Sequence, residues 1–111
     1  MSKPDVRIIL CTAPSSHARS IARSLVDERL VACVNIVPGV RSVYRWEGVI
    51  EEEQEDLMVM KTMASRVLEL KHAIGQSHPY DVPEIIVLDV SDGQSDYLAW
   101  VADSVGESED L

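Results

Sequence analysis

The chain has 111 residues, of which 46% are hydrophobic, and these values fit one globular domain with an ordinary core. Its formal net charge is −9, from 10 Lys and Arg residues against 19 Asp and Glu residues. Nucleic-acid-binding proteins neutralise phosphates with a basic patch, so this balance argues against such a partner. We therefore expect a single domain over residues 1–111 that binds no nucleic acid.

The beginning of the sequence does not have the pattern of a targeting segment. Residues 1–5 are not a basic stretch that leads into a long apolar run, and the apolar run of residues 8–10 is too short to span a membrane. We therefore expect a cytoplasmic protein with no membrane partner. Cys11 and Cys33 belong to no Cys-x-x-Cys motif, so reduced thiols are expected rather than a disulfide framework.

The first predicted elements are a buried strand and an amphipathic helix. The strand runs from Val6 to Thr12, and residues 13–16 then supply a break and a serine hydroxyl to cap the helix. The apolar stripe of this helix consists of Ala18, Ile21, Ala22, Leu25 and Val26. A second strand starts at Leu30 or Val31 and continues to Val37.

The next stretch, up to Thr62, has the pattern of one long β-ribbon. It is broken at Pro38-Gly39 and reversed around Glu47-Gly48. Its acidic residues are expected to form a solvated tip; they are Glu51, Glu52, Glu53, Glu55 and Asp56. Because an isolated ribbon is marginally stable and an exposed strand edge invites pairing, we expect the ribbon to contact another copy of the same chain.

The C-terminal half is predicted to contain a second helix, a strand and a third helix. Ser65 is the expected N-cap of the second helix and Gly75 its end. Residues 78–83 contain two prolines and form a rigid connector to a strand from Glu84 to Val90. A short helix with Tyr97, Leu98 and Val101 follows, and residues 106–111 have the composition of a frayed tail.

This order of elements predicts an α+β fold of the ferredoxin-like, split β-α-β type, with a long protruding hairpin and a short C-terminal helix. The helices would cover one face of an antiparallel sheet. Its other face would carry alternating apolar residues that need a cover, and about three copies packed sheet against sheet would provide one. We therefore expect a homotrimer; the sequence identifies no other protein partner.

Five segments carry a family resemblance: LCTAP at residues 10–14, ACVNIVPG at 32–39, YRWEG at 44–48, HPYDVPE at 78–84 and DYLAW at 96–100. In this order and spacing they resemble the CutA divalent-cation-tolerance proteins. The resemblance implies a ferredoxin-like subunit in a stable trimer, an architecture similar to that of trimeric nitrogen-regulatory signalling proteins. It also implies a role in tolerance to divalent metals, copper above all.

The resemblance associates Cys11 and His78 with copper or another divalent cation. A helix N-terminus that follows Cys11 favours a thiolate, and Pro79 holds His78 in a fixed connector. Some family members have a further histidine where this chain has Ser77, a poor ligand for transition metals. The alternatives are a small buried side chain for Cys11 and a loop histidine bonded to backbone for His78. Cys33 is expected in the core and His17 in solvent.

A second candidate site lies on the ribbon. Tyr44 and Trp46 share one strand face, where they either pack across a trimer interface or line a pocket between subunits. The other residues proposed for that pocket are Lys61, Tyr80 and Glu84. The alternative is an ordinary cluster on a sheet face with one charge pair.

Two functions follow from these sites. The first is divalent-cation homeostasis by a trimeric metal-binding protein with no organic cofactor, and the second is sensing of a small molecule in a cleft between subunits. The sequence has no familiar catalytic arrangement and no phosphate-binding loop, so an enzyme is not expected. A thiol activity of Cys11 with His78 as base is the remaining enzymatic alternative.

Overall fold

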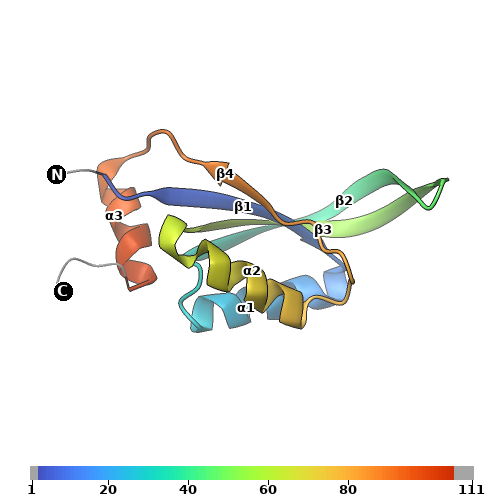
Figure 1. The fold of residues 1–111 in the computed structure, drawn as a ribbon, viewed down its shortest axis with the longest axis horizontal. Coiled ribbons are helices and arrows are strands. Elements are labelled where there is room, and N and C mark those ends of the chain that lie inside the picture. The colour runs from blue at the N-terminus through green and yellow to red at the C-terminus, as the bar shows by residue number, and fades with distance from the viewer. Residues whose placement is uncertain (1–2, 107–111) are drawn as a thin grey trace.

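The structure is a computed structural model that describes residues 3–106. The elements within them are β1 (Val6–Ala13), α1 (Ser15–Asp27), β2 (Cys33–Trp46), β3 (Val49–Met63), α2 (Val67–Ser77), β4 (Ile86–Asp89) and α3 (Ser95–Ser104). The strands form an antiparallel sheet in the order β2-β3-β1-β4. This arrangement confirms the predicted α+β, ferredoxin-like split β-α-β fold (Figure 1).

The main core lies between the sheet and the pair of helices α1 and α2, which cover one of its faces (Figure 1). Strand alternation turns Ile9 and Cys11 of β1 toward these helices, together with Met58 and Met60 of β3. All these side chains are fully buried. Val26 was predicted on the apolar stripe of α1 but is 44% exposed, because it lies at the edge of that stripe.

A second, smaller core lies at the end of the sheet away from the hairpin, where α3 packs (Figure 1). Val6 and Met63 contact Leu98, Val101 and other apolar residues of α3 there. The Arg66 guanidinium donates hydrogen bonds from Nε and Nη2 to the carbonyl oxygen of Val105, at 3.0 and 2.7 Å. These bonds satisfy a carbonyl group at the C-terminal end of α3. No helix among the described residues has the length and hydrophobicity to cross a membrane.

The hairpin of β2 and β3 extends far beyond this body (Figure 1). The molecule measures 50 × 25 × 22 Å, and its radius of gyration is 15.0 Å. A compact domain of this length would have a radius of about 13 Å. The chain reverses at Glu47 and Gly48, whose φ angles are 51° and 83°. Positive φ at both positions is the property of a tight hairpin turn, so the predicted reversal is confirmed.

A β-bulge marks the point where the hairpin leaves the body. Val37 pairs with Leu57 and Val40 with Glu55, so Pro38 and Gly39 face a single residue, Asp56. Gly39 adopts a φ of 70°, which a side chain would strain. The break predicted at Pro38-Gly39 is therefore confirmed, and it redirects the strand without ending it.

Asp56 holds this bulge against α1. Its Oδ1 accepts hydrogen bonds from the Ser15 hydroxyl at 2.7 Å and from the Gly39 N–H at 3.3 Å. Two sequence-based expectations are wrong here. The serine expected to cap α1 does not do so: Ser15 is the first residue of the helix, the N-cap is Pro14, and the Ser15 hydroxyl donates to Asp56. Asp56 is only 8% exposed and is not part of a solvated tip.

The structure corrects two predicted strand ends. The strand expected from Leu30 or Val31 begins at Cys33, because the Leu30 carbonyl accepts a hydrogen bond from the Thr62 hydroxyl at 2.7 Å rather than a ladder bond. The left-handed φ of 59° at Arg29 also places a turn just before it. The strand expected from Glu84 to Val90 is confined to β4, residues 86–89.

The predicted limits of the second helix are also wrong. Its N-cap is Arg66, preceded by a 3₁₀ turn over Ala64–Arg66 that contains Ser65. The helix passes through Gly75 and ends at Ser77, because the proline after His78 pushes that residue into an extended conformation. The frayed tail predicted for residues 106–111 lies, after Gly106, outside the described residues.

The sheet face opposite α1 and α2 is apolar and partly exposed. We call it the open face; its residues are Ile8, Leu10, Val37, Leu57, Val59, Ile86 and Leu88. Val37, Ile86 and Leu88 are 44%, 46% and 43% exposed. Cys33 pairs with Lys61 on this side and is only half-buried, so its expected place in the core is wrong.

Candidate functional site

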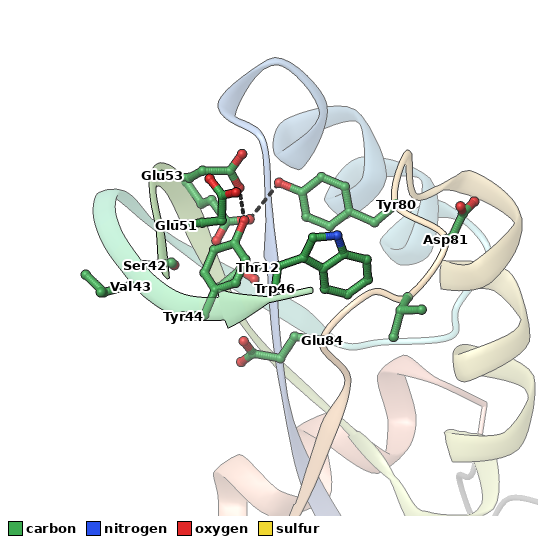
Figure 2. A pocket seen from close by; sticks show the side chains of 12 residues that line it. Thr12, Ser42, Val43, Tyr44, Trp46, Glu51, Glu53, Tyr80, Asp81 and Glu84 are labelled. Carbon is green, nitrogen blue, oxygen red and sulfur yellow. Dashed lines mark hydrogen bonds between the residues drawn. The ribbon is translucent and has the colours of Figure 1, made fainter. Parts of the chain in front are cut away.

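An open pocket of about 800 Å³ lies where β1 ends and the hairpin leaves the body. The hairpin forms one side, and the connector between α2 and β4 forms the other (Figure 2). The lining residues are Thr12, Ser42, Val43, Tyr44, Trp46, Glu51, Glu53, Glu55, Tyr80, Asp81, Val82 and Glu84. The set combines aromatic rings with carboxylates and contains no Lys, Arg or His.

Strand alternation explains how the hairpin residues meet. Tyr44 pairs directly with Glu51 in the β2–β3 ladder, so the two side chains share a face. Trp46 lies two residues further along β2, so its side chain is on the same face. Glu53 and Glu55 follow Glu51 on β3 at two-residue intervals, and their side chains are on this face too. One face of the hairpin therefore carries Tyr44 and Trp46 together with three of the five pocket carboxylates, those of Glu51, Glu53 and Glu55.

Two tyrosine hydroxyls are held by these carboxylates. The Tyr44 hydroxyl donates to Glu53 Oε1 at 2.7 Å, and the Tyr80 hydroxyl donates to Glu55 Oε2 at 2.8 Å (Figure 2). The bond to Glu53 is the main cause that raises the pKa of Tyr44 to about 12. Burial and the bond to Glu55 also raise the pKa of Tyr80. Both phenols therefore stay protonated at neutral pH and fix the orientation of their rings.

Glu55 differs from the other carboxylates in its burial. It is 4% exposed, whereas sequence analysis placed it in a solvated tip. Its hydrogen-bond donor is the neutral Tyr80 hydroxyl, and no ion pair within residues 3–106 includes it. Buried charges in proteins are usually paired, so this carboxylate lacks the cationic partner that such a position calls for.

Cys11 lies behind the pocket on the helix side of β1. Its side chain is fully buried, and burial raises the pKa of its thiol to about 12, with smaller contributions from the negative charges of Glu84 and Glu55. The lowered pKa expected from a helix N-terminus is therefore wrong, because desolvation and these carboxylates outweigh the helix field. The thiol is protonated at neutral pH.

His78 uses both ring nitrogens. Nε2 lies 2.8 Å from the carbonyl oxygen of Thr12, and Nδ1 lies 3.1 Å from the backbone nitrogen of Tyr80. Because a carbonyl only accepts, Nε2 carries the proton and Nδ1 accepts from Tyr80. His78 is 7% exposed, and the free electron pair of its ring is already engaged. The structure matches both alternatives to metal binding that the sequence left open: Cys11 is a small buried side chain, and His78 is hydrogen-bonded to the backbone.

The two predicted metal ligands are nevertheless neighbours. His78 contacts the backbone of Thr12, the residue that follows Cys11, so both side chains lie at the same end of β1. No group of three or more His, Cys, Asp or Glu side chains suited to a metal ion occurs in the described part of the chain. Their role as metal ligands stays a prediction.

The structure brings together most residues proposed for the second site. Trp46, Tyr80 and Glu84 line the pocket, as does Tyr44, which was proposed for a subunit interface. Lys61 does not: it pairs with Ile8 and Cys33 near the other end of the sheet and donates a hydrogen bond to Asn35. Because β3 is long, Lys61 lies six residues beyond Glu55 and outside the lining within one chain, and its place in a pocket between subunits stays a prediction.

Sequence reasoning missed the carboxylate wall of the pocket. A signal was present, since Glu51, Glu53 and Glu55 alternate in phase with the two aromatic residues once the turn at residues 47–48 fixes the register. His17 is exposed near the start of α1, as expected.

The protonated, buried thiol gives a testable expectation. Iodoacetamide at neutral pH should leave Cys11 unmodified in the native protein, and its alkylation should speed up as the pH rises toward about 12, where the thiolate forms. Mass mapping of the Cys11 peptide measures this. Denatured protein, in which the same peptide must react readily, is the control. Equal rates for native and denatured protein at neutral pH would contradict the burial described here.

The comparisons with known proteins agree on the family. Residues 7–104 match the family model described as CutA1 divalent ion tolerance protein. The Divalent-cation tolerance protein CutA of Thermus thermophilus is 47% identical over 100 residues, which cover 89% of this chain and 97% of that protein.

Solved structures show the same fold. CutA1 from Oryza sativa superposes with a TM-score of 0.91 at 38% identity, over 96% of this chain and 98% of that one. The structure described as PII-like protein CutA from Nostoc sp. PCC 7120 superposes with a TM-score of 0.87 at 36% identity, over 92% and 99% of the two chains. With the family model matched along almost the whole chain and a fold shared with solved members, the chain belongs to the CutA1 divalent ion tolerance protein family.

Proposed function

We propose that this chain acts in divalent-cation homeostasis as a homotrimeric metal-binding protein of the cytoplasm, with copper as the first candidate ion. The family to which the chain belongs supports the link to divalent cations. A thiol with an imidazole suits copper, which binds soft sulfur and nitrogen ligands. The proposal is for a binding protein, and the raised pKa of the Cys11 thiol, about 12, argues against the alternative of a thiol activity at neutral pH.

The observation that carries the metal proposal is the contact between His78 and the residue next to Cys11. His78 Nε2 lies 2.8 Å from the Thr12 carbonyl oxygen, so the two candidate ligands come from distant parts of the chain to the same end of β1. Binding must displace two things: the proton of the Cys11 thiol, and the Tyr80 N–H that occupies Nδ1 of His78. Copper binding is therefore expected to release a proton and to move the connector.

Calorimetric titration of copper and zinc into reduced protein tests this proposal. Wild type should bind copper and release a proton, so the measured heat should depend on the ionisation enthalpy of the buffer. Cys11→Ala should lose both the binding and the buffer dependence. Cys33→Ala is the matched control, because it removes the other thiol, which is half-buried on the open face.

Either of two results would overturn the metal site. Copper binding that survives Cys11→Ala unchanged would exclude Cys11 as a ligand. Binding that is lost equally in Cys33→Ala would place the metal on the open face. Circular dichroism of each variant shows whether the fold is retained.

The open face supports the homotrimer. Exposed apolar surface of this extent on a sheet usually marks an interface, and a protruding hairpin gains stability from packing against another chain. A second copy of the chain presents the same apolar face and hairpin. In such an assembly the pocket, which lies at the base of the hairpin, would adjoin a neighbouring subunit.

The pocket supports a second candidate function, the sensing of a small molecule. A cavity of about 800 Å³ with aromatic walls falls within the size range of ligand sites. One structural relative is described as PII-like, a term that refers to that protein alone. One substitution distinguishes the two functions. Trp46→Ala should remove small-molecule binding and leave the copper titration unchanged.

A further inference from the structure

We propose that the pocket at the base of the hairpin binds a small organic cation, an alkylammonium compound, between its aromatic rings and its carboxylates. The proposal names the ligand class for the small-molecule function above and rests on that function. It does not depend on Cys11 or His78 as metal ligands.

The first argument is charge. Five carboxylates line the pocket, from Glu51, Glu53, Glu55, Asp81 and Glu84, and no lining residue is basic. Walls of one sign concentrate counter-ions in a cleft. The decisive residue is Glu55, which is 4% exposed and has no cationic partner among the described residues. A cation in the pocket would supply that partner, whereas an anion would meet only repulsion.

The second argument is the aromatic wall. Tyr44, Trp46 and Tyr80 border the same cavity (Figure 2), and an alkylammonium group gains stability over the faces of such rings. Trp46 is 51% exposed in the single chain, so no side chain of its own subunit covers its ring. Both tyrosine hydroxyls are fixed by glutamates, which holds the two phenol rings in place before any ligand arrives.

The third argument separates an organic cation from a metal ion. A bare divalent ion needs several oxygen ligands that converge on one point. The part of the chain that the structure describes holds no group of three or more side chains arranged in this way, so the carboxylates are spread around the walls. A bulky, weakly hydrated ammonium group suits carboxylates that are spread out, and its alkyl groups suit Trp46 and Val82.

Fluorescence of Trp46 offers a direct test. The chain has two tryptophans, and Trp100 is on α3, outside the pocket, so Trp100→Phe leaves Trp46 as the sole indole reporter. Choline should change this fluorescence along a saturable curve. The neutral isostere 3,3-dimethylbutan-1-ol, which has the same shape and no charge, should bind about tenfold more weakly or worse.

Two glutamate variants in the Trp100→Phe background identify the site. Glu55→Gln keeps the shape and the acceptor for Tyr80 but removes the charge, and it should weaken choline binding about tenfold or more. Glu52→Gln is the matched control, because Glu52 lies on the other face of β3 beside Arg41 and outside the lining. If Glu55→Gln fails to fold, Trp46→Leu with calorimetric detection replaces it and should likewise weaken choline binding about tenfold or more.

Each alternative result overturns the proposal in a different way. Equal affinity for choline and the neutral alcohol would exclude the cationic class and keep the small-molecule function. A well-folded protein that binds neither compound would exclude alkylammonium compounds as ligands of this pocket. Saturation of the Trp46 signal by magnesium but not by choline would make the pocket a metal site.

Discussion

Replacing Leu88 with Asp is expected to give a folded monomer with a markedly lower melting temperature. Leu88 lies on the open face, opposite Ile8, and is 43% exposed in the single chain. In a monomer the new carboxylate would be solvated there at little cost. In a trimer packed through this face it would be buried without a partner, which costs several kcal/mol at each interface. The mass from light scattering should therefore fall to one third.

Val87→Asp is the matched control for this experiment. Val87 is the neighbouring residue in β4 and is 37% exposed, but strand alternation turns it to the opposite side of the sheet. It introduces the same charge into the same strand and should leave the trimer intact. If both variants remain trimeric, the open face is not the interface. Unfolding of both, seen by circular dichroism, would show that neither position 87 nor position 88 tolerates a charge, whatever the assembly.

The second large effect concerns the core. Leu70→Ala should lower the free energy of unfolding by about 2–5 kcal/mol, because it removes a buried side chain and leaves a cavity. Leu70 is fully buried between α2 and the sheet, where it belongs to the cluster that also contains Ile9 and Leu25. Denaturant unfolding at a fixed protein concentration measures the change, since the stability of an oligomer depends on concentration.

Leu68 provides the comparison, because it belongs to the same helix and is 78% exposed. Leu68→Ala makes the same chemical change in solvent and should alter the free energy of unfolding by about 0.5 kcal/mol or less. A cost at Leu68 as large as that at Leu70 would mean that this surface of α2 is covered in the assembly. The pair therefore tests both the core and the exposed side of α2.

Local patterns were sufficient to predict most of the fold. Alternation in β1, the helical stripe of α1 and the turn at Glu47-Gly48 depend on neighbours within a few residues, and the sequence shows these directly. The predicted limits of α2 failed because they relied on single residues. Gly75 is tolerated inside a helix, and the proline after His78 is the stronger stop signal.

The site was harder to predict because its properties depend on contacts between distant residues. Asp56 accepts a hydrogen bond from the hydroxyl of Ser15, 41 positions away in the sequence. Glu55 accepts one from the hydroxyl of Tyr80, 25 positions away. In the sequence both belong to an acidic run that has the composition of a solvated tip. The pKa of Cys11 was also predicted wrongly because it depends on distant residues. Burial and two carboxylates from other segments raise it, and they outweigh the adjacent helix.

Tyr80 connects the two candidate sites. Its backbone N–H bonds the His78 ring, and its hydroxyl bonds Glu55 in the pocket. A copper ion that takes Nδ1 of His78 must release Tyr80, whereas a ligand held against the Tyr80 ring keeps the connector in place. If copper and the organic cation bind as proposed, they would be antagonists, and by thermodynamic reciprocity each would weaken the other by the same factor. A chain of this size would then report the ratio of a metal to an organic cation rather than the level of either one.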